Sequence, residues 1–136
     1  VVVAEALEGR DGGDARQGGV ALGLGHLGRL DAAGEIAVDG GEAGLDALNP
    51  VQVACAGMDA VSLKRDFGKD LTLWGGGCDT QRVLPLASPH EVRDHVMGQV
   101  RALRDDGGFV FQQVHNILAT VPPENIITMF DAIQEA

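Results

Sequence analysis

The chain has 136 residues, enough for one domain, and 45% of them are hydrophobic, so a buried core can form. Its formal net charge of −10 at pH 7 argues against a nucleic-acid partner or an anionic membrane surface, since both attract basic faces. No apolar run reaches the ~18 residues of a membrane span and no signal peptide is visible, so we expect a cytoplasmic protein without a membrane partner.

Residues 1–46 use a restricted alphabet. Gly, Ala, Val, Asp and Glu, whose codons all begin with G, make up 34 of these 46 positions. A packed core needs larger side chains, and all five prolines, all four Phe and the single Trp lie further along the chain. Three interpretations stay open: a flexible or disordered segment, a weak α/β element, or a stretch translated out of frame. We place the boundary of this poorly ordered, Gly/Ala-rich segment at residue 43.

One motif in this segment matches the dinucleotide fingerprint G-x-G-x-x-G, with Gly23, Gly25 and Gly28 as its glycines. Its context is poor, because the following helix would have to fit before Gly34 and the nearest acidic partner for a ribose, Asp39, comes too early. With 12 glycines in 46 residues, a chance match is the favoured explanation, and no cofactor is predicted.

The first regular elements of the second half are a strand and a helix. Residues 47–53 are short and apolar, which predicts a buried strand. Asp59 is a suitable N-cap for a helix over residues 60–67, and Gly68 stands where a glycine in the left-handed conformation often follows a helix. Residues 71–74 predict a second strand, which three consecutive glycines close.

The clearest helix signal comes next. Ser88 as N-cap, Pro89 at the first position and Glu91 at the third form a capping box. The apolar residues Val92, Val96, Val100 and Leu103 then recur at helical spacing. Gly107 and Gly108 end this helix.

A third strand is predicted at residues 109–112, and Pro122-Pro123-Glu124 open a last helix. The apolar side of this helix is assigned to Ile126, Ile127, Phe130 and Ile133. The order β-α-β-α-β-α predicts parallel strands with right-handed crossovers, which fits part of a (β/α)8 barrel or a small doubly wound sheet.

Polar residues follow each predicted strand, and ligand sites in parallel α/β folds form at the carboxyl ends of strands. Asn49 and Gln52 close the first strand, Asp79 and Gln81 follow the second, and His115 follows the third. Histidine is the usual acid–base residue near neutral pH, so His115 is the candidate catalytic residue and the other four are candidate substrate-binding residues. Each also has a plainer interpretation, such as a turn capped by Asp79 or a structural role for His115.

Other chemistry-bearing residues carry weaker expectations. Cys55 and Cys78 cannot form a disulfide framework or a four-ligand zinc site, and Cys78 is expected to be a small packed thiol. His90 and His95 lie on the capped helix and are expected to be solvated.

Residues 44–136 resemble the C-terminal part of the uroporphyrinogen decarboxylase family, in its broad decarboxylase-like branch. The segments that carry the resemblance are 44–52, Leu63-Lys64, Phe67-Gly68, 71–76, 79–81, Leu84-Pro85, 107–109, 115–117 and 121–126. The resemblance implies a partial TIM barrel, roughly the last three βα units of a (β/α)8 fold, so the chain is interpreted as a fragment.

The resemblance also implies a chemistry. Its parent activity is decarboxylation of a tetrapyrrole without metal or cofactor, with His115 matching an active-site histidine and Asp79 matching a position on the rim of the barrel. The alternative within the superfamily is a corrinoid-linked methyltransferase component, which holds zinc through a His-x-Cys motif that this sequence lacks. A small α/β binding module without catalysis is the alternative outside the family, and homo-oligomerisation stays open. The chain alone is expected to be inactive.

Overall fold

The computed structural model describes residues 3–5, 46–55 and 57–136. In chain order its elements are β1 (Val3–Glu5), β2 (Ala47–Val51), α2 (Ala60–Phe67), β3 (Thr72–Gly75), α3 (Val83–Leu86), α4 (Pro89–Leu103), β4 (Phe109–Val110) and α5 (Pro123–Gln134). The predicted alternation of strands and helices from residue 47 onward is confirmed, with the short helix α3 as an addition before α4.

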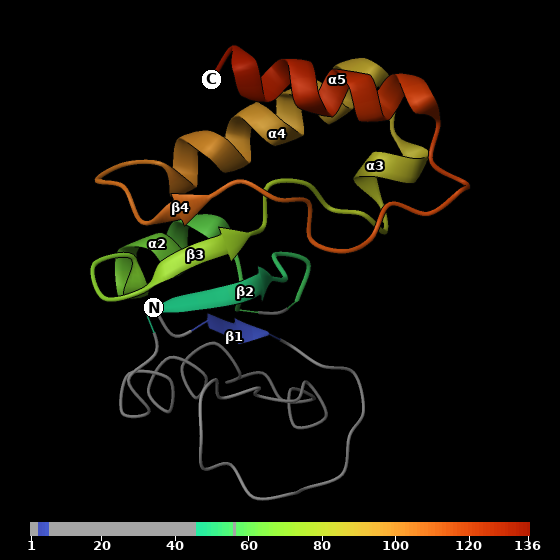
Figure 1. Cartoon of the computed structure of the whole chain (residues 1–136). Helices are drawn as coiled ribbons and strands as arrows, with labels where there is room; N and C mark the ends of the chain where they lie inside the picture. The colour runs from blue at the N-terminus through green and yellow to red at the C-terminus, as the bar shows by residue number, and fades with distance from the viewer. Residues whose placement is uncertain (1–2, 6–45, 56) are drawn as a thin grey trace, which may run out of the picture.

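The strands in the described part of the chain form one sheet in the order β1-β2-β3-β4, and each neighbouring pair is parallel (Figure 1). Leu48 lies opposite Leu73, and Leu73 lies opposite Phe109. These three side chains therefore share one face of the sheet. Beyond the ends of β3 and β4 the pairing resumes at a parallel bridge between Cys78 and Gln113.

Helix α2 covers the predicted residues. Its N-cap is Asp59, whose carboxylate accepts a hydrogen bond from the Ser62 backbone N at 2.9 Å. Gly68 follows the helix as predicted, but the predicted left-handed conformation is wrong, because its φ is −65°. Glycine fits there because a Cβ would lie 2.5 Å from the carbonyl oxygen of Lys64.

The capping box of α4 is confirmed. The Glu91 carboxylate accepts from the Ser88 backbone N at 2.8 Å, while Ser88 Oγ accepts from the Glu91 backbone N at 3.4 Å. The hydrogen bonds from Ser88 lower the pKa of the Glu91 carboxyl below its ordinary value. The four predicted apolar residues of this helix are all buried.

Strand boundaries differ from the prediction by one or two residues. Strand β2 stops at Val51 because the chain then turns, with the Cys55 backbone N donating to the Gln52 carbonyl. Strand β4 comprises only Phe109–Val110, and β3 begins one residue later than predicted.

Residues 3–5 are the part of the N-terminal segment that the structure describes, and Val3–Glu5 form β1 and pair in parallel with residues 47–49. The other predictions for residues 1–43, including the glycine motif at Gly23, Gly25 and Gly28, lie outside the described residues.

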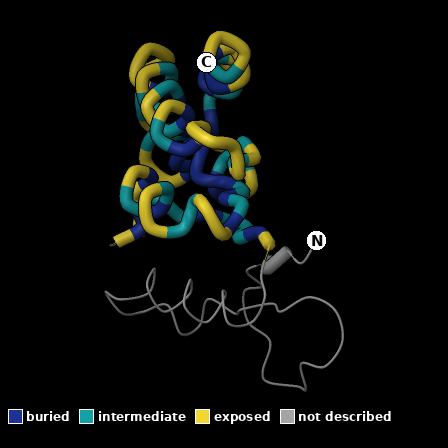
Figure 2. The backbone as a smooth tube through the Cα atoms, turned by 90° about the vertical axis from the view of Figure 1, so that its left-hand side faces the viewer, coloured by how far each residue is buried: buried dark blue, intermediate teal, exposed yellow. Residues whose placement is uncertain are grey.

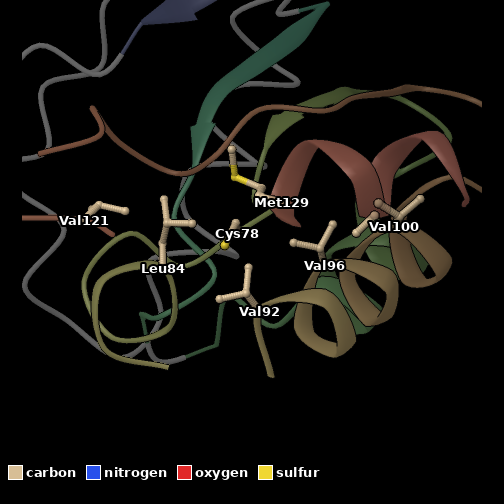
Figure 3. Close-up of a cluster of buried hydrophobic side chains, with 8 residues drawn as sticks. Cys78, Leu84, Val92, Val96, Val100, Val121 and Met129 are labelled. Atoms are coloured by element: carbon tan, nitrogen blue, oxygen red, sulfur yellow. The ribbon is translucent and has the colours of Figure 1, made fainter. Parts of the chain in front are cut away.

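The buried positions gather in the interior of the described part of the chain (Figure 2). Their hydrophobic side chains form two clusters. The first joins β2 and β3 to α2 and α4 and comprises Val51, Met58, Ala60, Leu63, Leu73 and Leu103. The second involves the loop after β3 with α3, α4 and α5 and comprises Cys78, Leu84, Val92, Val96, Val100, Val121, Met129 and Ala132 (Figure 3). Phe109 packs against both clusters, so they form a continuous interior.

The predicted apolar face of α5 is wrong in part. Its buried residues are Asn125, Met129 and Ala132, while Ile127 and Phe130 are exposed. Met129 and Ala132 pack in the second cluster, and the periodicity of large apolar residues had favoured the neighbouring stripe. Tertiary packing, rather than the size of the side chains, selects which face of α5 is covered.

Candidate functional site

The loops that follow β2, β3 and β4 lie at one edge of the sheet, because these strands are parallel neighbours. The loops after β3 and β4 leave the sheet side by side, since the Val114 backbone N donates to the Cys78 carbonyl at 3.0 Å. The residues that come next are Asp79 and His115. The structure thus brings the backbones of these predicted site residues to one edge, as the strand assignments require.

Three consecutive glycines end β3 and begin the loop that follows it. Gly75 and Gly76 have φ values of +115° and +75°, a conformation that favours glycine. Close neighbours give a second reason. A Cβ on Gly75 would lie 2.8 Å from the Val51 backbone N, and one on Gly77 would lie 2.3 Å from the ring of Phe111. Val51 of β2 and Phe111 after β4 therefore fill the space that larger residues would need at these two positions.

Asp79 is buried, and its carboxylate serves the local backbone. Its Oδ1 accepts hydrogen bonds from the backbone N of Gln81 at 2.8 Å and of Arg82 at 3.1 Å. Its carbonyl accepts from the Leu84 backbone N at 2.9 Å. The plainer interpretation, a turn capped by Asp79, therefore describes the geometry, and the exposed Gln81 contributes its amide N–H to that turn.

Asn49 and Gln52 flank the end of β2, and both are half-buried. Asn49 lies within the strand, where it pairs with Glu5, and precedes a cis peptide bond to Pro50. The Gln52 side-chain oxygen is buried and has no hydrogen-bond partner among the described residues. Among the predicted binding residues, Gln52 is therefore the one with a buried, unsatisfied polar atom in the described structure.

His115 is exposed at the surface of the loop after β4. Among the described residues, no hydrogen bond joins its ring to Asp79 or to another group. Cys78 is fully buried, and burial raises the pKa of its thiol to about 12. The expectation of a packed thiol is confirmed, because a thiol with this pKa is not a ready nucleophile.

His95 is the functional candidate that the sequence interpretation missed. It was expected to be solvated, but it is half-buried and its Nε2 lies 3.2 Å from the Asp79 backbone N, from which it accepts a hydrogen bond. Burial lowers the pKa of His95 below its ordinary value, against the opposing charge of Asp79. The signal was its position three residues after the buried Val92, at the edge of the apolar stripe of α4.

Within the described residues, no cluster of three or more His, Cys, Asp or Glu side chains is arranged to hold a metal ion. In the same part of the chain, every helix is too short or too polar to cross a membrane. Neither a scan against models of protein families nor a search of curated proteins finds a match to this chain.

At this edge of the sheet, the exposed imidazole of His115 therefore lies beside a loop that hydrogen bonds hold in place. His115 can donate or accept a proton, while the loop after β3 is held in one conformation by Asp79 and His95. Sites of this kind are completed by loops from further strands in parallel barrels.

Proposed function

We propose that residues 44–136 are the last three βα units of a uroporphyrinogen decarboxylase-like barrel, whose parent protein decarboxylates a tetrapyrrole. The observation that carries this proposal best is the winding of the sheet. Strands β2, β3 and β4 are neighbours in chain order and all parallel, without the reversal of strand order that defines a doubly wound sheet.

The positions of the helices support the same proposal. Leu63 of α2 and Leu103 of α4 both pack with Leu73, so the two helices cover one face of the sheet. By the alternation of strand residues, Trp74 and Val110 point to the other face, and Val110 is 40% exposed. In a closed barrel, helices occupy the outer face and the opposite face lines the interior.

In this proposal His115 is the proton donor or acceptor at the rim of the barrel. Asp79 and Gln81 shape the neighbouring loop, with Asn49 and Gln52 beside it at the end of β2. The buried side-chain oxygen of Gln52 has no hydrogen-bond partner in the described part of the chain, which suits a residue that gains one when a ligand is present. A tetrapyrrole with carboxylate arms would require further positive groups from other strands of the parent.

The test is an assay of the parent barrel, obtained by translating the upstream DNA in all frames and adding the five βα units that this proposal expects there. We expect release of CO₂ from uroporphyrinogen. The variant His115→Ala should slow it by roughly 10²–10⁴-fold, the usual contribution of a general acid or base. His90→Ala is the matched control, because His90 is exposed on α4, and this variant should retain the activity.

Three outcomes would contradict the decarboxylase proposal. Upstream DNA without five βα units would refute the barrel, and a barrel that neither binds nor decarboxylates uroporphyrinogen would refute the activity. Methyl transfer from a methylcorrinoid to a thiol would instead assign the parent to the methyltransferase branch.

A further inference from the structure

The loop after β3 is fixed at Asp79 by contacts of two kinds. Three hydrogen bonds are local, from the backbone N atoms of Gln81 and Arg82 to the Asp79 carboxylate and from that of Leu84 to its carbonyl. The fourth crosses to another element, because the Asp79 backbone N donates to Nε2 of His95 on α4. This contact ties the start of the loop to the helix that packs behind it.

The direction of this hydrogen bond fixes the protonation of the ring. A backbone N–H can only donate, so Nε2 must be the unprotonated nitrogen of a neutral imidazole that carries its proton on Nδ1. A proton on Nε2 would place two donors against each other at 3.2 Å. The contact is therefore compatible with only one of the three protonation forms of His95.

We propose that neutral His95 is the positioning residue of the loop after β3, and that its protonation in mild acid releases the main chain at Asp79. This inference concerns the conformation of the loop and does not depend on the proposed decarboxylation. If the proposed function holds, it makes the geometry of the site loop sensitive to pH.

The charges around His95 determine where this release occurs. Burial lowers the pKa of His95 below 6.5, and the Asp79 carboxylate acts in the opposite direction. Asp79 is the one described group whose charge acts on the ring. The elements packed against α4 carry further ionised residues, namely Lys64, Arg65 and Asp66 on α2, Arg82 before α3, and Glu124, Asp131 and Glu135 on α5.

The sign of the effect on stability follows from this lowered pKa. The folded chain binds fewer protons at His95 than the unfolded chain between the lowered pKa and 6.5. The contribution of His95 to the stability of the folded chain is therefore full above pH 6.5. It falls as the pH decreases through that window. The release of Asp79 is expected within the same range.

The experiment is an NMR titration of the full 136-residue chain, following the Asp79 amide and the His95 ring together. In the wild type we expect both signals to titrate with one midpoint below pH 6.5, with the Nδ1–H tautomer above it. In His95→Gln, whose amide oxygen can accept the hydrogen bond without titrating, the histidine step should disappear while protection of the Asp79 amide persists.

The second arm removes the acceptor. His95→Leu should speed exchange of the Asp79 amide by roughly fivefold to tenfold at all pH values, the usual net effect of one lost hydrogen bond. His90→Gln, a change at an exposed histidine of the same helix, should leave the Asp79 titration unchanged. An Asp79 amide that does not follow the His95 ring, or a ring protonated on Nε2 at neutral pH, would overturn the proposal. Because the wild type and His95→Gln decide the outcome, the test stands even if His95→Leu fails to fold.

Discussion

Two buried polar residues flank the short helix α3. The Asp79 carboxylate accepts hydrogen bonds from the backbone N of Gln81 and Arg82 in the turn before the helix. At the end of the helix, Asn125 Nδ2 donates to the carbonyls of Leu84 and Ala87, both at 2.9 Å. A four-residue helix can satisfy few of its own backbone groups. Side chains from elsewhere in the fold therefore make this helix possible.

The substitution Asn125→Ala should destabilise the chain. It removes the donor that satisfies two carbonyl groups at a residue that is 1% exposed, so we expect a loss of ~1–3 kcal/mol in the free energy of unfolding. Urea denaturation measures this loss. The control Asn116→Ala, at an exposed asparagine, should have little effect, and equal stability of the two variants would contradict the assigned role.

The two cysteines should differ sharply in reactivity. Cys78 is fully buried with a pKa raised to about 12, whereas Cys55 is exposed. A thiol reagent at pH 8 should therefore label one cysteine in the folded chain and both after denaturation. The variant Cys55→Ser should show no fast labelling when folded. Rapid modification of Cys78 in that variant would show that the second cluster opens readily.

At the scale of the elements, two glycines predict opposite responses to the same substitution. Gly75 ends β3 with a φ of +115°, and an added Cβ would meet the Val51 backbone N. Gly98 lies within α4, where an added Cβ would have no atom within 4 Å. Gly75 is needed because of its positive φ and the close Val51 backbone. Gly98 needs no such space, and a glycine inside a helix weakens it.

We expect Gly75→Ala to destabilise the chain by ~1–3 kcal/mol and Gly98→Ala to stabilise it by ~0.5–1 kcal/mol. Thermal unfolding of both variants beside the wild type measures the two effects. If Gly75→Ala were neutral, the close approach of β2 and β3 at this point would be wrong.

At the scale of the whole molecule, the sheet has open surfaces. Strand β4 pairs with β3 alone in the described sheet, and Val110, on the face opposite α2 and α4, is 40% exposed. The outer helices add the exposed side chains of Leu86, Ile127 and Phe130. Unpaired strand edges and exposed apolar residues favour association between copies.

The isolated chain should therefore associate as its concentration increases and should catalyse neither decarboxylation of uroporphyrinogen nor methyl transfer. A catalytic pocket needs loops from more strands than β2, β3 and β4 supply, and the exposed His115 has no described partner to orient a substrate. Sedimentation at several concentrations and an assay beside His115→Ala measure both properties. Turnover that His115→Ala abolishes, or a strict monomer at every concentration, would contradict this expectation.

Local signals in the sequence determined much of the second half of the chain. Asp59 and the capping box of Ser88 and Glu91 place two helices because each side chain acts on backbone groups within three residues of itself. The alternation of strands and helices also follows from local patterns, and it predicts parallel pairing and a common edge for the loops after β2, β3 and β4.

Only the tertiary structure decided the features that depend on contacts distant in sequence. Strand β1 needs β2 as its partner, α3 needs Asn125 from α5, and the buried face of α5 depends on α4 and its neighbours. The glycines after β3 are explained by Val51 and Phe111, and His95 gains its role from an amide 16 residues away. These outcomes required the folded chain because the sequence periodicity of one element carries no information about which groups another element brings against it.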